Sequence, residues 1–175
     1  MKKLLLLALA MALPQAAVLA ADKNPDAAFY KKAAEGGMAE VELGKLAKQK
    51  SASQSVKDFA AMMIDDHSAA NEELKSIAAT KDINWPSSPS MAQKATKTKL
   101  EVLSGATFDK SYIKGMIKDH EEDIEEFQKE ADAGRDPEAK AFARSILPTL
   151  RAHLSKIQSI AQSAGLTANA DTDTD

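Results

Sequence analysis

The most informative absence in this sequence is cysteine. Without a thiol, the chain forms no disulfide, offers no thiolate nucleophile and cannot build a cysteine-ligated zinc site. Its one long apolar run, at residues 4–13, is too short to span a membrane. The formal net charge of −3 lacks the excess of positive charge that nucleic-acid-binding proteins use, so we expect no nucleic-acid partner.

Residues 1–20 have the composition of an export signal. Two lysines precede the apolar run, and the small-residue sequence Val18-Leu19-Ala20 follows it, which predicts cleavage after Ala20. Loss of the two lysines takes the formal net charge from −3 to −5. We therefore expect a periplasmic protein without a membrane span in the mature chain. It would comprise a helical domain at residues 21–165 and a disordered acidic tail at residues 166–175.

Apolar residues recur every three or four positions in four long segments, which is the spacing of amphipathic helices. These predicted helices span residues 24–50, 53–80, 107–133 and 136–165. A shorter helix is expected at residues 89–104, and no segment shows the alternating pattern of a strand.

Four helices of similar length predict an all-α protein built as a four-helix bundle. The link between the second and third long helices has about 25 residues, enough to return along the whole bundle. Such a connection makes these two helices parallel. The predicted fold is therefore a ferritin-like four-helix bundle with a short extra helix in that link.

Each long helix carries one polar residue near the middle of its inward-facing apolar stripe: Glu40, His67, His120 and His153. Helix midpoints in a bundle lie at a similar level whichever way the helices run, so we expect these side chains to converge in the core. Three imidazoles and a carboxylate are a ligand set for a first-row transition metal. Asp123 shares a helix face with His120 and is a fifth candidate ligand, or a hydrogen-bond partner of a ligand.

Other interpretations of these residues stay open. A histidine in an apolar stripe is often a buried side chain with one hydrogen bond. Asp66, Asp119 and Glu121 are neighbours in sequence that can serve as partners elsewhere on the surface. Three clustered imidazoles without a metal would form a pH-responsive core. Met63 and Met116 precede two of the histidines by one turn. Their thioethers would favour copper(I), although methionine at such positions usually fills a core.

A combination of spaced motifs covers about Phe29 to Ile160. The motifs are Phe29–Ala47, Asp65–Asn71, Phe108–Tyr112, Asp119-His120 and Leu147–Leu154. Together they resemble an exported bacterial family, domain of unknown function 4142, whose members are often labelled predicted outer membrane proteins. The resemblance implies a ferritin-like helical fold.

The candidate ligands differ from those of the di-iron ferritins. Those proteins use Glu-x-x-His pairs, whereas Ile64, Ile117 and Leu150 stand three residues before the three histidines here. The spacing argues against ferroxidase chemistry and favours a mononuclear site.

The sequence thus predicts a periplasmic helical bundle that binds a transition metal, copper, zinc or iron, in envelope stress or metal homeostasis. The alternative is a structural or interaction module of the envelope whose histidines pack or sense pH without a metal. A metal-dependent redox enzyme is a third hypothesis. We predict no catalytic residue, because the sequence contains neither a nucleotide-binding glycine loop nor a nucleophile elbow.

Overall fold

Helices make up the architecture of residues 24–166, the part of the chain that the computed structural model describes. The helices are α1 (Ala27–Lys50), α2 (Gln54–Ala78), α3 (Met91–Glu101), α4 (Gly105–Ala133) and α5 (Pro137–Ser163). Residues 24–166 contain no strand, which confirms the all-α prediction. The predicted export signal, and the predicted tail after its first residue, lie outside the described residues.

Local sequence signals begin three of these helices. Before α2, the Ser53 hydroxyl accepts the backbone N–H three residues later at 3.5 Å. Before α3, Ser90 and Gln93 form a capping box in which each side chain accepts the other residue's backbone N–H. Asp136 caps α5 and is followed by a proline at the first helical position.

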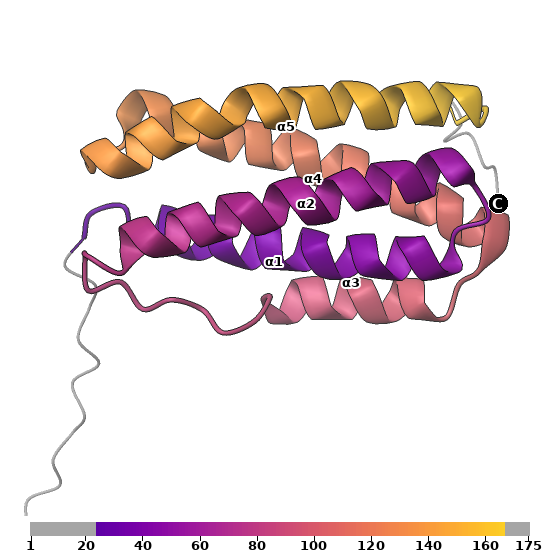
Figure 1. The fold of residues 1–175 in the computed structure, drawn as a ribbon, viewed down its shortest axis with the longest axis horizontal. Helices are drawn as coiled ribbons and strands as arrows, with labels where there is room; N and C mark the ends of the chain where they lie inside the picture. Colours follow the sequence, from indigo (N-terminus) through magenta and orange to yellow (C-terminus); the bar gives the residue numbers. More distant parts are fainter. Residues whose placement is uncertain (1–23, 167–175) are drawn as a thin grey trace, which may run out of the picture.

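The helices form two antiparallel hairpins, α1 with α2 and α4 with α5 (Figure 1). After α2, the link at residues 79–104 returns along the bundle, and α3 within it packs beside α1 and α4. As a result α2 and α4 run in the same direction, as Figure 1 shows. This is the connection of a ferritin-like four-helix bundle, and it confirms the predicted fold.

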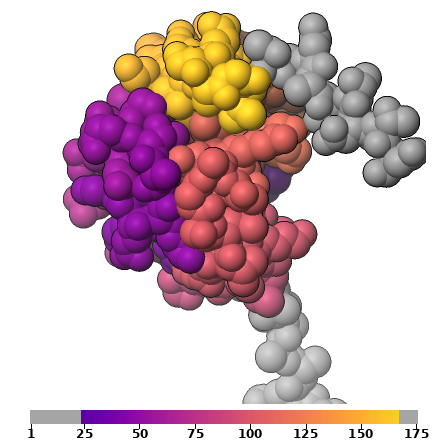
Figure 2. All heavy atoms as spheres, turned by 90° about the vertical axis from the view of Figure 1, so that its right-hand side faces the viewer, coloured from indigo at the N-terminus to yellow at the C-terminus, as the bar shows by residue number. Residues whose placement is uncertain are grey.

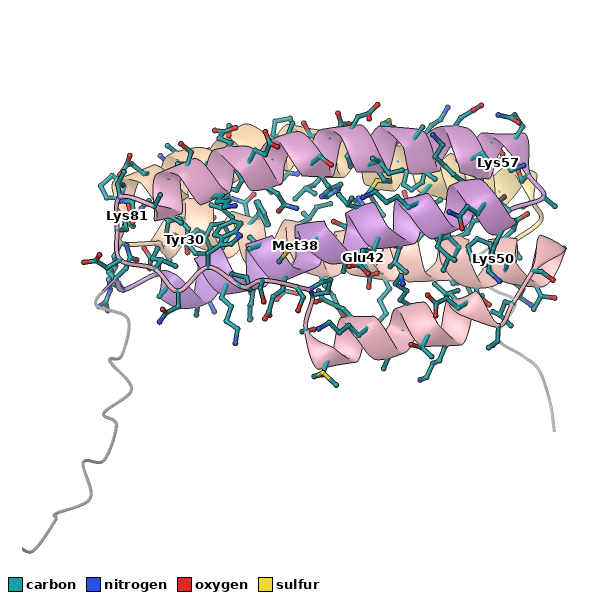
Figure 3. All side chains as sticks on the ribbon, turned by 60° about the horizontal axis from the view of Figure 1, so that its bottom comes forward. Tyr30, Met38, Glu42, Lys50, Lys57 and Lys81 are labelled. Carbon is teal, nitrogen blue, oxygen red and sulfur yellow. The ribbon has the colours of Figure 1, made fainter. Side chains whose placement is uncertain are left out.

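Side chains fill the space between the helices (Figure 3). Tyr30 points into the bundle at the end where Lys81 lies, and Lys50 and Lys57 mark the opposite end. Figure 2 shows the end of the bundle where Lys50 and Lys57 lie. At this end the start of α4 lies beside the α1–α2 hairpin and the end of α5. None of the described helices combines the length and apolar character that a membrane crossing requires.

The buried core consists of two apolar clusters separated by a polar layer. One cluster includes Phe59 and the other includes Phe127. Along each long helix, one buried polar residue lies between the segments that contribute to the two clusters. This layer consists of Glu40, His67, His120 and His153.

Close packing of α1 on α2 depends on a glycine in α1. A Cβ atom at Gly44 would stand 2.9 Å from Cγ1 of Ile64 and 3.0 Å from the carbonyl oxygen of Ala60. We expect Gly44→Ala to destabilise the protein by about 1–2 kcal/mol, because overpacking costs more than alanine's helix preference contributes. Urea denaturation of the variant and the parent measures this difference.

Gly115 in α4 provides the matched control. A Cβ atom there would meet no described heavy atom within 4 Å. Gly115→Ala is expected to raise the free energy of unfolding by about 0.5–1 kcal/mol, since alanine favours the helix without a clash. If Gly44→Ala and Gly115→Ala both raise the free energy of unfolding, the prediction is wrong, because α1 and α2 can then move apart without a loss of stability.

Candidate metal centre

The three histidines of the chain meet inside the polar layer. His67 comes from α2, His120 from α4 and His153 from α5, and all three side chains are buried. Their ring centroids are 5.4–5.8 Å apart. Each ring offers one nitrogen, and these three nitrogens lie within 4.8 Å of one another.

Two of these rings have a tautomer that their partners determine. Nδ1 of His120 lies 2.9 Å from the Met116 carbonyl oxygen, which can only accept, so Nδ1 carries the proton. Nε2 of His153 lies 2.8 Å from a carboxylate oxygen of Asp66 and donates to it. The remaining nitrogens, Nε2 of His120 and Nδ1 of His153, face each other at 3.4 Å.

In neutral rings both of these facing nitrogens carry lone pairs, because each ring has already placed its one proton on the other nitrogen. Two acceptors form no hydrogen bond with each other. A cation between them would satisfy both lone pairs. His67 is similar: its Nδ1 lies 2.9 Å from Oε2 of Glu40, and its Nε2 has no hydrogen-bond partner among the described residues.

Glu40 lies beside the histidines on α1. Its Oε1 is 3.5 Å from Nδ1 of His120, and its Oε2 is the neighbour of His67. These contacts are close but not aligned as hydrogen bonds, and both oxygens lack a partner within residues 24–166. Neither Glu40 nor Asp123 belongs to the group of three ligand atoms within 4.8 Å of one another.

Three surrounding residues were not recognised as part of the site from the sequence. The sequence predicts that Asp66 serves groups elsewhere on the surface, but its side chain reaches across from α2 to His153 on α5. Phe59 packs against His120 and His153, with ring centroids 6.4 Å from each. The buried Tyr112 hydroxyl has no hydrogen-bond partner among the described residues. Its pKa is raised mainly by burial and also by the nearby Glu40 carboxylate.

Burial keeps the histidines in the form that binds metals. It lowers the pKa of His67 to about 4, and it lowers the pKa values of His120 and His153, despite the nearby carboxylates. All three rings are therefore neutral at pH 7, and neutral imidazole is the metal-ligating form.

Burial also raises the pKa of Glu40 to about 7, although His120 opposes this rise. The folded protein thus holds a proton on Glu40 that the unfolded chain releases near pH 4.5, so stability falls as the pH rises from about 4.5 to 7. We expect metal-free Glu40→Gln to be more stable than the parent at pH 8 and to lose this advantage by pH 4. Urea denaturation at both pH values tests this. An equal loss of stability at both values would show that Glu40 makes a needed hydrogen bond.

Two cavities border the polar layer. One, of about 160 Å³, lies between α2 and α5 and is lined by Asp66, His67 and His153, among others. The other, of about 230 Å³, lies between α1, α3 and α4 and reaches Glu40 and Asp123. The histidine cluster can therefore be approached from two sides.

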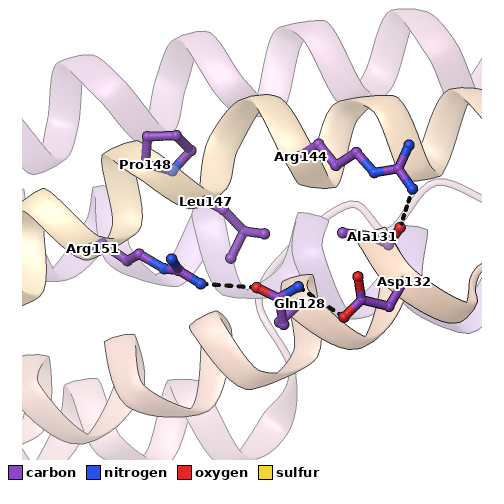
Figure 4. Close-up of a pocket in the computed structure, with 7 residues that line it drawn as sticks. All are labelled: Gln128, Ala131, Asp132, Arg144, Leu147, Pro148 and Arg151. Carbon is purple, nitrogen blue, oxygen red and sulfur yellow. Dashed lines mark hydrogen bonds between the residues drawn. The ribbon is translucent and has the colours of Figure 1, made fainter.

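A third pocket, of about 450 Å³, lies between α4 and α5 and includes none of the histidines (Figure 4). Its polar groups bind one another. Arg144 donates to the Ala131 carbonyl at 2.7 Å, and Arg151 donates to the Gln128 side chain at 2.8 Å. Both arginines thus have partners in the pocket wall.

The family described as "Domain of unknown function (DUF4142)" matches residues 10–160. The chain belongs to this family. Its description names no activity, and no curated protein sequence matches the chain. The resemblance that the motifs indicated is thus confirmed.

Solved structures with a similar fold have low sequence identity. A DUF305 protein from Streptomyces coelicolor is 15% identical with a TM-score of 0.70, over 81% of this chain and 93% of that one. CopM in its Cu(II)-bound form is 16% identical with a TM-score of 0.67, over 79% and 96%. A DUF305 fragment from Deinococcus radiodurans is 16% identical with a TM-score of 0.69, over 81% and 98%. These likenesses support the helical fold.

Proposed function

We propose that this protein binds one transition metal ion through His67, His120 and His153. The observation that carries the proposal is the pair of lone-pair nitrogens that face each other at 3.4 Å. Bonds of about 2.0–2.1 Å at tetrahedral angles separate two ligand nitrogens by about 3.3–3.4 Å. The 3.4 Å between Nε2 of His120 and Nδ1 of His153 therefore matches the separation of two ligands on such an ion.

The partners of the outward nitrogens support the same role. Metal-binding histidines commonly donate their other N–H to a carboxylate or a carbonyl, which orients the ring. Asp66 and the Met116 carbonyl do so here. We do not assign Glu40 as a ligand, because it lies 2.9 Å from Nδ1 of His67 without an aligned hydrogen bond, whereas the unpaired nitrogen of that ring is Nε2. Asp123 has no ligand role in this assignment.

Copper is the first candidate ion. Imidazole suits copper, zinc and iron, so the donor atoms alone leave a choice among them. CopM, which has a similar fold, was solved in Cu(II)-, Cu(I)- and silver-bound forms, and this favours copper over the other two. With the export signal expected at residues 1–20, we place the protein in the periplasm, in metal homeostasis of the envelope.

The alternative, a structural module without a metal, draws support from the partners already present. His120 and His153 each have a hydrogen bond to a protein acceptor, which holds both rings in place without an ion. pH sensing near pH 6 is less well supported, since burial lowers the pKa of His67 to about 4.

Measuring the metal content of the protein distinguishes the metal-binding function from the structural module. We expect protein incubated with Cu(II) and then desalted to retain one ion per chain by elemental analysis, and Zn(II) and Fe(II) to be retained less. Co(II) should produce visible absorption bands of histidine coordination. A protein that retains none of these ions at pH 7 would favour the structural module.

A further inference from the structure

The cavity between α1, α3 and α4 is lined by carboxylates. Glu40 on α1 and Asp119, Glu122 and Asp123 on α4 contribute to its wall. α3 forms the opposite wall through Ala92, Gln93 and Thr96. Four carboxylates in one cavity, opposite three uncharged residues of α3, make the cavity attractive to cations.

Glu40 connects this cavity with the histidines. Its side chain is only 4% exposed, lines the cavity and approaches His67 to 2.9 Å. No hydrogen-bond donor is aligned with either of its oxygens within residues 24–166. A buried carboxylate without a partner is costly, and a passing cation would relieve that cost. This orphaned group is an observation independent of the other acids.

We propose that the cavity beneath α3 is the route by which a transition metal cation reaches His67, His120 and His153. The inference rests on the proposed metal-binding function and adds the path of entry. The outer acids concentrate cations at the entrance, and Glu40 receives the ion before the histidines bind it. Glu40 thus acts as a positioning residue for loading.

Two features of the walls fit a route. Gly36 has no side chain to narrow the entrance, where a Cβ atom would lie 3.9 Å from both Asp123 Oδ1 and Gln93 Nε2. α3 contributes one buried residue, Leu100, so little apolar contact holds it against the bundle. Outward movement of α3 would widen the cavity with small loss of buried surface.

The cavity between α2 and α5 is the competing route. It is smaller, at about 160 Å³, and two acids line it, Asp66 and Glu73. Asp66 already accepts a hydrogen bond from His153, so it offers less to an incoming ion than the unpartnered Glu40. These differences favour the route beneath α3.

Each cavity has one exposed alanine in its wall, which permits a matched test. Ala92 lines the cavity beneath α3, and Ala69 lines the cavity between α2 and α5. Co(II) binding is followed by stopped-flow absorption in the parent, Ala92→Phe and Ala69→Phe. We expect Ala92→Phe to slow binding by about tenfold with the final absorption unchanged. Ala69→Phe should bind at a rate within about twofold of the parent.

A second pair of variants removes a charge instead of adding a bulky side chain. Both substituted residues, Glu122 and Glu73, are exposed, so we expect both variants to fold. Glu122→Gln should slow Co(II) binding at low salt, and the difference should shrink at high salt as screening grows. Glu73→Gln, in the other cavity, should leave the rate unchanged. Circular dichroism of each variant checks that it remains helical.

The possible results are distinct. Slow binding by Ala69→Phe and Glu73→Gln alone would overturn the proposed route in favour of the α2–α5 side. Unchanged rates in all four variants would overturn it as well, because entry would then depend on neither cavity. If the parent protein shows no absorption from Co(II) bound to histidine, the proposed function itself is refuted. If the parent binds Co(II) but only Ala69→Phe and Glu73→Gln bind it slowly, the route alone is refuted.

Discussion

His120→Leu is expected to abolish metal-dependent stabilisation and to leave the metal-free protein folded. At a free metal concentration about 100 times the dissociation constant, binding to the native state alone adds about 2.7 kcal/mol to the free energy of unfolding. This gain should vanish in the variant. The metal-free form should keep its stability within about 1 kcal/mol, since leucine suits the surrounding apolar clusters and the Met116 carbonyl keeps its helical bond.

Thermal denaturation at pH 7 with and without Cu(II) measures both quantities. His153→Leu should give the same result, because its partner Asp66 has a side chain that is 45% exposed and can be hydrated. His67→Leu should also lose the metal effect and leave the metal-free protein folded, since Glu40 keeps His120 as a neighbour.

Met63→Leu is the matched control. Met63 is fully buried one turn before His67, and a swap of similar volume costs less than about 1.5 kcal/mol. Its metal-dependent stabilisation should equal that of the parent. If the stabilisation instead persists in all three histidine variants, the ion binds elsewhere and the histidine cluster is packing alone.

Asp136→Ala is expected to cause the largest loss of stability. The buried Asp136 carboxylate accepts hydrogen bonds from Asn24 at 2.6 Å, Tyr30 at 3.1 Å and Lys81 at 2.9 Å, and from the backbone N–H of Glu138 at 3.0 Å. It therefore joins the start of α1, the end of α2 and the start of α5. Removing one partner of such a buried charged network costs about 3–5 kcal/mol.

The hydrogen bonds to Asp136 also predict how stability depends on pH. Burial tends to raise the pKa of Asp136, but hydrogen bonds from Lys81 and Asn24 lower it to about 2. Because the folded-state pKa lies below the unfolded value of 3.8, the contribution to stability is complete above about pH 4 and is lost as the pH falls through about 2. Asp136→Ala should lack this acid-dependent loss in urea denaturation.

Asp132→Ala serves as the control for Asp136→Ala. Asp132 is exposed and accepts a bond from Gln128 within the same helix, so its removal should change stability by no more than about 0.5 kcal/mol. Equal effects of the two substitutions would show that the network around Asp136 contributes little.

Helix positions were readable from the sequence because they depend on local rules. The predicted helix at residues 107–133 differs from α4 by two residues at its start, and the one at residues 53–80 differs from α2 by one or two residues at each end. Apolar spacing, caps and glycines determine these positions within a few residues. The length of the link at residues 79–104 was enough to predict the parallel course of α2 and α4.

The sequence by itself also determined that the three histidines belong to one buried layer, since each sits on an apolar stripe near a helix midpoint. Only the tertiary structure decided which atoms meet there. The Asp66–His153 contact, the position of Glu40 beside Nδ1 of His67 and the two cavities all join different helices. Such contacts depend on how each helix is rotated and shifted along its axis, and a shift of one residue moves a side chain by about 1.5 Å and 100°. The periodic pattern of one helix sets its inward face, but it leaves these offsets between helices undetermined.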